Sequence, residues 1–163
     1  MKIRVSDIGA AGLKVNDTIP LEPLNSRMNE ACHNDILFTE NPDVEVMVHR
    51  TPSGAQVKGF AKAKYTQPCS LCLEDLERQA EVKIDYVFQR KNPLELSAKN
   101  EKDYSYYDDI GICYFSGEHI ELEELIQESL ILSLDQYWRP PQTEKGSCSI
   151  CGADCSKMLA IGE

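Results

Sequence analysis

Two pairs of cysteines with identical spacing constrain this chain more than any other feature of its sequence. Cys69 and Cys72 stand near the middle, and Cys148 and Cys151 stand near the end, followed by Gly152. A Cys-x-x-Cys turn directs both sulfurs to one side, and zinc sites are commonly built from two such turns. The 75 residues between the two pairs are too many for a compact zinc finger. If the four sulfurs meet, a zinc ion ties the end of the chain to its middle.

The chain has seven cysteines in all, and their spacing favours metal binding. In a reducing compartment, paired Cys-x-x-Cys motifs indicate metal or redox chemistry rather than structural disulfides. A redox pair usually opens a helix whose N-terminus lowers the thiol pKa, whereas the first pair here stands between two predicted strands. We therefore predict a structural zinc ion bound by Cys69, Cys72, Cys148 and Cys151. A thiol redox or metal-handling protein is the alternative, and pairs that hold no metal are another. Cys155 is an extra thiol that stands close enough in sequence to replace one ligand.

The composition and charge argue against several classes of function. No apolar run approaches the roughly 20 residues that a membrane-spanning helix requires, and the N-terminus lacks the apolar core of a secretion signal. We therefore expect a cytoplasmic protein without a membrane partner. The formal net charge of −10 argues against non-specific binding to nucleic acid. Residues 50–91 nevertheless carry eight Lys or Arg residues against five Asp or Glu residues, so they are a candidate contact for one RNA or protein surface.

Alternating patterns over residues 40–90 predict a β-hairpin followed by a further strand. The first predicted strand, residues 43–50, places three valines on one face: Val44, Val46 and Val48. The second strand, residues 55–65, alternates apolar residues with lysines, and residues 80–88 alternate again. Gly59 stands on the apolar side of the second strand and indicates a β-bulge. The lysines are most simply the solvated face of the hairpin, and RNA contact is their second interpretation: Lys58, Lys62 and Lys64.

The clearest helical pattern covers residues 121–136. Its apolar residues recur at helical spacing, and glutamates occupy the first turn, where the helix dipole favours negative charge. The stripe consists of Leu122, Leu125, Ile126, Leu130, Ile131 and Leu134. We expect this face to pack on the three valines of the first strand and on Val82, Ile84 and Phe88.

The remaining segments have weaker patterns. Residues 2–5 favour a short strand, and residues 26–31 favour a short helix capped by Asn25, because Pro20 and Pro23 argue against an earlier start. Residues 91–117 are predicted to be an acidic loop that includes a short strand near its end, over residues 110–115.

Together these patterns predict an α+β fold in which residues 1–163 form one domain. A mainly antiparallel sheet of about five or six strands is covered by one principal amphipathic helix. A C-terminal Cys-x-x-Cys tail occupies residues 140–163.

No catalytic constellation is present in the sequence. The chain has no nucleotide-binding loop, nucleophile elbow or metal-plus-base motif. None of its histidines, His33, His49 and His119, has a neighbouring carboxylate or thiol at a spacing that suggests catalysis. The acidic residues near residue 105 match no calcium loop. We therefore predict that the protein is not an enzyme, has no catalytic residue and takes no small-molecule substrate.

Three motifs in this order resemble a known family. They are Cys-Ser-Leu-Cys-Leu-Glu at residues 69–74, the helical segment at residues 120–134 and Gly-Ser-Cys-Ser-Ile-Cys-Gly-Ala-Asp at residues 146–154. With the hairpin before them they cover about two thirds of the chain. The ordered set resembles the YceD family, bacterial and plastid proteins linked to the accumulation of large-subunit ribosomal RNA.

The resemblance implies a non-catalytic factor in large ribosomal subunit biogenesis. Its partner would be the precursor of large-subunit ribosomal RNA or a ribosomal protein, and its mechanism would be binding. The competing class is the thiol redox or metal-handling protein described above.

Overall fold

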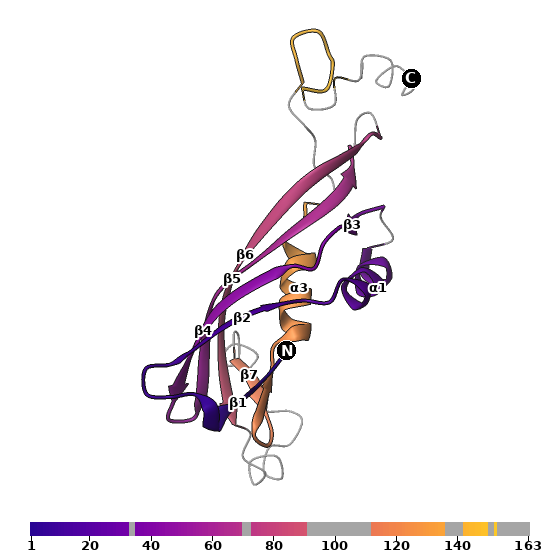
Figure 1. Ribbon diagram of the computed structural model, residues 1–163. Helices are drawn as coiled ribbons and strands as arrows, with labels where there is room; N and C mark the ends of the chain where they lie inside the picture. The colour runs from indigo at the N-terminus through magenta and orange to yellow at the C-terminus, as the bar shows by residue number, and fades with distance from the viewer. Residues whose placement is uncertain (33–34, 70–72, 91–111, 136–141, 150–151, 153–163) are drawn as a thin grey trace, which may run out of the picture.

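The computed structural model describes residues 1–32, 35–69, 73–90, 112–135, 142–149 and 152. It confirms an α+β fold, in which a six-stranded sheet carries two helices and a two-stranded sheet lies beside them (Figure 1). The strands are β1 (Lys2–Arg4), β2 (Leu13–Thr18), β3 (Leu37–Phe38), β4 (Asp43–Thr51), β5 (Gly54–Pro68), β6 (Asp75–Arg90), β7 (Ile112–Phe115) and β8 (His119–Glu121). The helices are α1 (Leu21–Cys32) and α3 (Glu123–Ser133), and a 3-10 turn, η1, covers Val5–Asp7.

The predicted hairpin forms the centre of the large sheet. The strand order is β2-β4-β5-β6-β7, and β3 pairs with β5 beyond the end of β4. The register between β4 and β5 runs without interruption through Val46 and Gly59, so the predicted bulge at Gly59 is wrong. A Cβ atom at this position would lie 2.0 Å from the carbonyl oxygen of Glu45. The glycine is therefore required by the close approach of the neighbouring backbone.

The strand predicted near residues 110–115 is present as β7, but it runs parallel to β6. A parallel neighbour needs a crossover connection rather than a tight turn. Residues 91–111 supply that connection and lie outside the described residues, so most of the predicted acidic loop is not described.

The helix α1 corrects the prediction of a single principal helix. It begins at Leu21 rather than at Ser26, and Pro23 stands in its first turn, where the missing N–H is not needed. Asn25 does not cap the helix. Its side chain donates to the carbonyl oxygen of Phe38 and accepts from the Phe38 N–H, both at 2.9 Å, so it joins α1 to β3.

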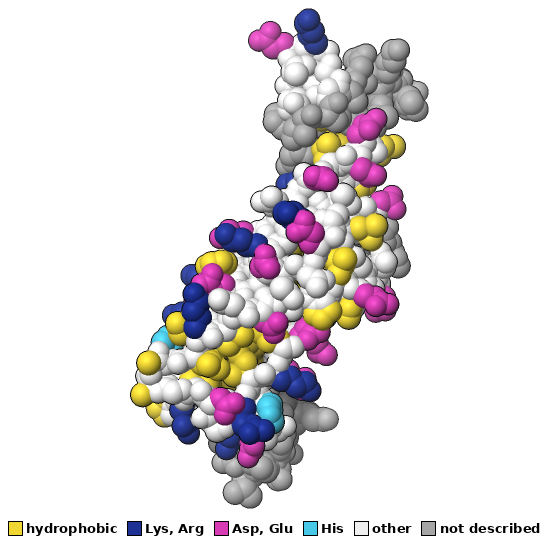
Figure 2. Space-filling model, viewed as in Figure 1, with side chains coloured by type: hydrophobic (Ala, Val, Ile, Leu, Met, Phe, Trp, Pro, Cys, Tyr) yellow, Lys and Arg dark blue, Asp and Glu magenta, His cyan; other side chains and the backbone are white. Residues whose placement is uncertain are grey.

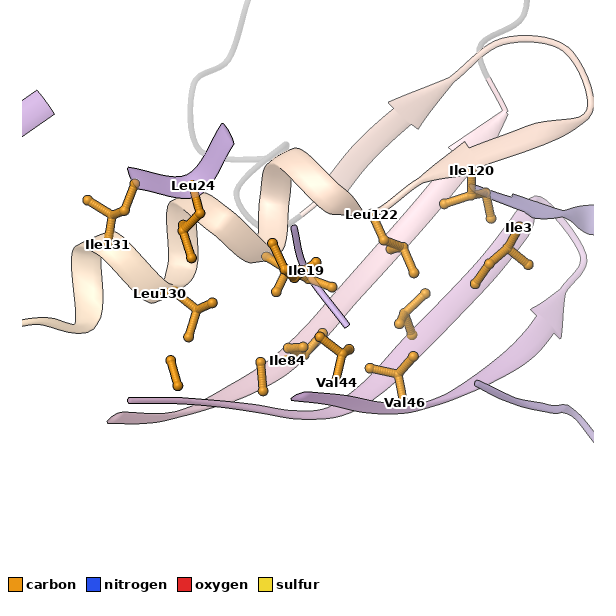
Figure 3. Packing of buried hydrophobic residues seen from close by; sticks show 14 of the residues in the cluster. Ile3, Ile19, Leu24, Val44, Val46, Ile84, Ile120, Leu122, Leu130 and Ile131 are labelled. Atoms are coloured by element: carbon orange, nitrogen blue, oxygen red, sulfur yellow. The ribbon is translucent and has the colours of Figure 1, made fainter. Parts of the chain in front are cut away.

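The core lies between the two helices and the inner face of the sheet. Leu122, Ile126 and Leu130 are fully buried in the same core as the valines of β4, as predicted. Figure 3 shows Leu122 and Leu130 on the side of the helix segment that faces Val44, Val46 and Ile84. Leu125 and Val82 differ from the prediction, since both are only partly buried. The small sheet joins the same core through buried residues of β1 and β8. Among the helices that the structure describes, none is long and apolar enough to span a membrane.

Candidate functional site

The first cysteine pair lies at the tip of the β5–β6 hairpin. Cys69 follows the last residue of β5 directly, and its side chain is fully buried. The Cys69 N–H donates to the carbonyl oxygen of Glu74 at 2.9 Å, and the Leu73 N–H donates to the carbonyl oxygen of Cys69 at the same distance. Leu73 adopts a positive φ of 62°, which closes the turn. Cys72 lies outside the described residues.

The second cysteine pair repeats this local geometry. The Gly152 N–H donates to the carbonyl oxygen of Cys148 at 2.9 Å, and Gly152 has a φ of 75°. Cys148 is buried and pairs with Gln142 in an isolated bridge. Cys69 and Cys148 thus each begin a turn. In both turns the fourth residue after the cysteine has a positive φ, and its N–H donates to the cysteine carbonyl oxygen. Cys151 lies outside the described part of the chain.

One buried contact brings the end of α3 close to the first cysteine turn. Gln67 precedes Cys69 by two residues and is 2% exposed. Its side-chain amide donates to the carbonyl oxygen of Asp135, just after α3, at 2.6 Å. Arg78 donates to the other end of the same amide at 2.8 Å, which fixes its orientation. The chain therefore leaves α3 beside the tip of β5.

The described residues do not by themselves assemble a metal site. No group of three or more His, Cys, Asp or Glu side chains is placed to hold a metal ion within the described ranges. Those ranges include only Cys69 and Cys148 of the four predicted ligands. The four-cysteine site accordingly stays a prediction.

The three candidate RNA-binding lysines lie together on the outer face of β5, and each is paired with a carboxylate. Lys58 lies 3.8 Å from Asp85, Lys62 lies 3.3 Å from Glu81, and Lys64 lies 2.8 Å from Glu40. The hydrogen bond to Glu40 raises the pKa of Lys64 above its ordinary value. Figure 2 shows basic and acidic side chains interspersed along the molecule. The predicted basic face is therefore a face of mixed charge.

The surface around these lysines has three open hollows, each lined in part by charged side chains. One hollow of about 270 Å³ lies between the β3–β4 connection and β6, and is lined by Glu40, Lys62, Lys64 and Glu81 among others. Neighbouring hollows of about 500 and 480 Å³ flank it on the same face. Small-molecule sites are usually concave and mostly apolar. This open, charged face suits contact with another macromolecule better.

The sequence patterns did not indicate that the described residues leave one edge of β6 open. This strand pairs with β5 over Asp75–Gln89, but within the described ranges it pairs on its other side only with β7, over Val87–Arg90. Alternation in the sequence could have shown that residues 75–90 form a strand, but an open edge depends on which strands pair, and no local pattern reports that.

Comparison with known proteins gives one match. The family model described as large ribosomal RNA subunit accumulation protein YceD matches residues 57–158, which is well over half of the chain. No curated protein and no solved structure matches the chain significantly. The matched region runs from β5 through α3 to the second cysteine pair, and so contains the candidate site. The chain therefore belongs to the YceD family, the family of the large ribosomal RNA subunit accumulation protein.

Proposed function

We propose that the protein is a non-catalytic factor in large ribosomal subunit biogenesis, which acts by binding a precursor of large-subunit ribosomal RNA or a ribosomal protein. Membership of the YceD family carries the proposal, because the family's description names the accumulation of large ribosomal subunit RNA. The open, charged outer face of the sheet supports a binding role.

RNA contact through Lys58, Lys62 and Lys64 is the first of the two binding modes. Their side chains are between 53 and 57% exposed. Surface ion pairs contribute little to stability and are screened by salt, so phosphate groups can displace the carboxylates. The second mode is contact between the acidic surface of the protein and a basic ribosomal protein, which the net charge of −10 favours.

A charge-reversal experiment separates the two modes. The variant Lys58→Glu/Lys62→Glu/Lys64→Glu should fold normally and, if RNA is the partner, should lose co-sedimentation with large-subunit precursors. The loss should resemble the effect of added salt, because phosphate contacts release counterions. Lys2→Glu/Arg4→Glu in β1 is the control, since it changes charge on the small sheet. Normal co-sedimentation of the triple variant would exclude the lysine face as an RNA contact, and absence of wild-type co-sedimentation would overturn the proposed function.

We also propose that Cys69, Cys72, Cys148 and Cys151 bind a structural zinc ion. Three observations support this site: the repeated spacing, the burial of both described thiols, and the matching turns at Cys69 and Cys148. The Gln67–Asp135 contact brings the end of α3 close to Cys69. Thiolate ligands in two such turns provide the tetrahedral sulfur environment that zinc prefers.

Elemental analysis tests the zinc proposal. We expect about one equivalent of zinc in the wild-type protein. Cys72→Ser should lose the metal, because structural zinc sites contribute roughly 10–16 kcal/mol of apparent binding energy and need all their thiolates. Cys113→Ser should retain it, since Cys113 lies in β7. Equal zinc content in the wild type and Cys72→Ser would refute this ligand set, and a thiol that titrates well below its usual pKa would favour the redox alternative.

A further inference from the structure

The open edge of β6 is long for a sheet of this size. β6 pairs with β5 from Asp75 to Gln89, and its other side meets β7 only from Val87 onward. Between Asp75 and Tyr86, the residues that the structure describes place no strand on this other side. An unpaired edge presents a row of backbone donors and acceptors that another extended chain can bind.

Two backbone hydrogen bonds show which residues of β6 face this edge. At one end the Arg90 N–H donates to the carbonyl oxygen of Ser53 at 2.8 Å, and at the other the Glu74 carbonyl accepts from Cys69 at 2.9 Å. Even-numbered residues therefore face β5 at both ends, and the register between them has no interruption. Because backbone groups alternate sides along a strand, the odd-numbered residues face the open edge. They are Asp75, Glu77, Gln79, Glu81, Lys83 and Asp85.

An apolar strip runs along the inner side of this edge. Ala80 and Val82 are only partly buried, whereas Ile84 of the same strand is fully buried. The helix α3 lies over β6, and the Tyr86 hydroxyl donates to the carbonyl oxygen of Leu125 at 3.1 Å. Leu125 of α3, whose carbonyl oxygen accepts this bond, is also only partly buried. A strand added at the edge would cover these side chains.

The charges at the edge define what such a strand should carry. Of the six odd-numbered residues, four are carboxylates and one is a lysine, and their side chains are exposed on the outer face. Two of the carboxylates, Glu81 and Asp85, also lie beside Lys62 and Lys58 of β5. On the helix side, the charge of Glu128 acts on the hydroxyl of Tyr86. Opposite charges on neighbouring strands stabilise their pairing. A matching strand therefore alternates basic residues, directed outward, with small apolar residues, directed onto Ala80 and Val82.

We propose that the open edge of β6 binds an extended, basic segment of a partner protein by strand addition. Main-chain hydrogen bonds supply affinity in this mode, and the alternating side chains supply specificity. The inference rests on the proposed function, for which it names the chemistry of a protein partner. Basic segments are typical of proteins that bind RNA.

A backbone-directed substitution tests the proposal. The probe is a fluorescent peptide of alternating Lys and Val, about as long as the open edge, whose binding to the purified full chain is followed by anisotropy. Glu81→Pro removes an N–H that faces the edge, and it leaves the hydrogen bonds between β6 and β5 intact. Proline is tolerated at such positions of edge strands, where the N–H does not pair within the sheet. It should weaken binding about tenfold or more, since a lost hydrogen bond and the ring both act against the added strand. Glu81→Ala removes the same carboxylate but keeps the N–H, so it should lose clearly less affinity than Glu81→Pro does.

Hydrogen exchange on the wild-type protein keeps the test independent of the folding of the proline variant. The amides of Gln79, Glu81 and Lys83 should exchange rapidly alone and become protected by the peptide, whereas Ala80 should be protected throughout by β5. Protection without peptide would overturn the proposal, because the edge would already be covered by this chain or by a second copy. Equal losses in Glu81→Pro and Glu81→Ala, or equal binding of a Glu–Val peptide, would also overturn it.

These measurements use only the purified protein and the peptide. Peptide binding with failed co-sedimentation in cells would therefore overturn the proposed function and leave the β6 edge as a binding site. Normal co-sedimentation without peptide binding would overturn the β6 edge as a binding site and leave the proposed function standing.

Discussion

At the scale of single residues, backbone crowding decides which residue type can occupy position 59 in the centre of the sheet. Gly59 lies opposite Val46 in the pair β4–β5. An added Cβ atom would lie 2.0 Å from the Glu45 carbonyl oxygen and 2.7 Å from the Val46 Cα, and both are backbone atoms that cannot turn away. The position therefore excludes every residue except glycine unless the strands separate.

Gly59→Ala should destabilise the protein by about 3 kcal/mol or more, at the upper end of overpacking effects, because the strain falls on backbone atoms. Gly9→Ala is the matched control, since nothing lies within 4 Å of its added Cβ atom. The control should change stability by less than about 0.5 kcal/mol. Urea denaturation of the two variants checks both values, and a small loss in Gly59→Ala would show that the strands can move apart.

At the scale of elements, the helix α3 is held by one buried stripe. Ile126 and Leu130 are fully buried against the sheet, while Leu132 on the opposite side is 77% exposed. Arg27 of α1 donates to the Glu124 carbonyl oxygen at 3.0 Å, so the two helices also contact each other. The hydrophobic stripe supplies most of the attachment, because a single exposed hydrogen bond contributes little.

Ile126→Ala should cost about 2–5 kcal/mol of unfolding free energy, since it leaves a cavity in the core. Leu132→Ala is the control within the same helix and should change stability by less than about 0.5 kcal/mol. Chemical denaturation measures both. A cost below about 1 kcal/mol for Ile126→Ala would mean that the sheet closes over the cavity or that the helix contributes little to folding.

At the scale of the whole molecule, folding partly buries tyrosine and cysteine side chains, and burial favours their neutral, protonated forms. Burial raises the pKa of Tyr65, Tyr86 and Cys113 above their ordinary values, and the charge of Glu128 raises that of Cys113 further. For Tyr86, the hydrogen bond with Ser129 opposes the effect of burial. The unfolded chain releases these protons at a lower pH than the folded protein does, so stability must fall as the pH rises.

Below the ordinary thiol pKa of about 8.5, these groups should contribute no pH dependence to the stability of the protein. It should then decrease through the ordinary tyrosine pKa of about 10 until the folded protein also loses the protons. Urea unfolding over this alkaline range measures the slope. Tyr86→Phe should make the slope shallower, because it removes one of the groups. Parallel curves for the wild type and Tyr86→Phe would show that the phenol ionises equally in both states.

Local patterns in the sequence were sufficient to predict that the hairpin, β6 and α3 exist, but not all of their bounds. β6 begins at Asp75 rather than at Ala80, and Glu121, where the helix was predicted to begin, lies in β8. The alternation of Val44, Val46 and Val48 and the helical stripe through Ile126 each involve residues within a few positions of one another. Such patterns specify which face of an element is apolar, and burying that face decides the layer in which it lies. The YceD family was also recognisable from ordered local motifs.

The structure of the candidate site depended on contacts that no local pattern contains. Lys64 and Glu40 pair across 24 positions, and this pairing turns a predicted basic face into a mixed one. Asn25 became a link to β3 rather than a cap because Phe38 offered both backbone groups. The parallel direction of β7 and the open edge of β6 follow from the order in which strands pair. By itself, the sequence determined that the hairpin, β6 and α3 exist and which side each buries, because neighbours a few positions apart decide both. Only the tertiary structure decided the bounds of α1, which charges meet and which strand edge the described residues leave open, because distant partners compete for the same backbone and side-chain groups.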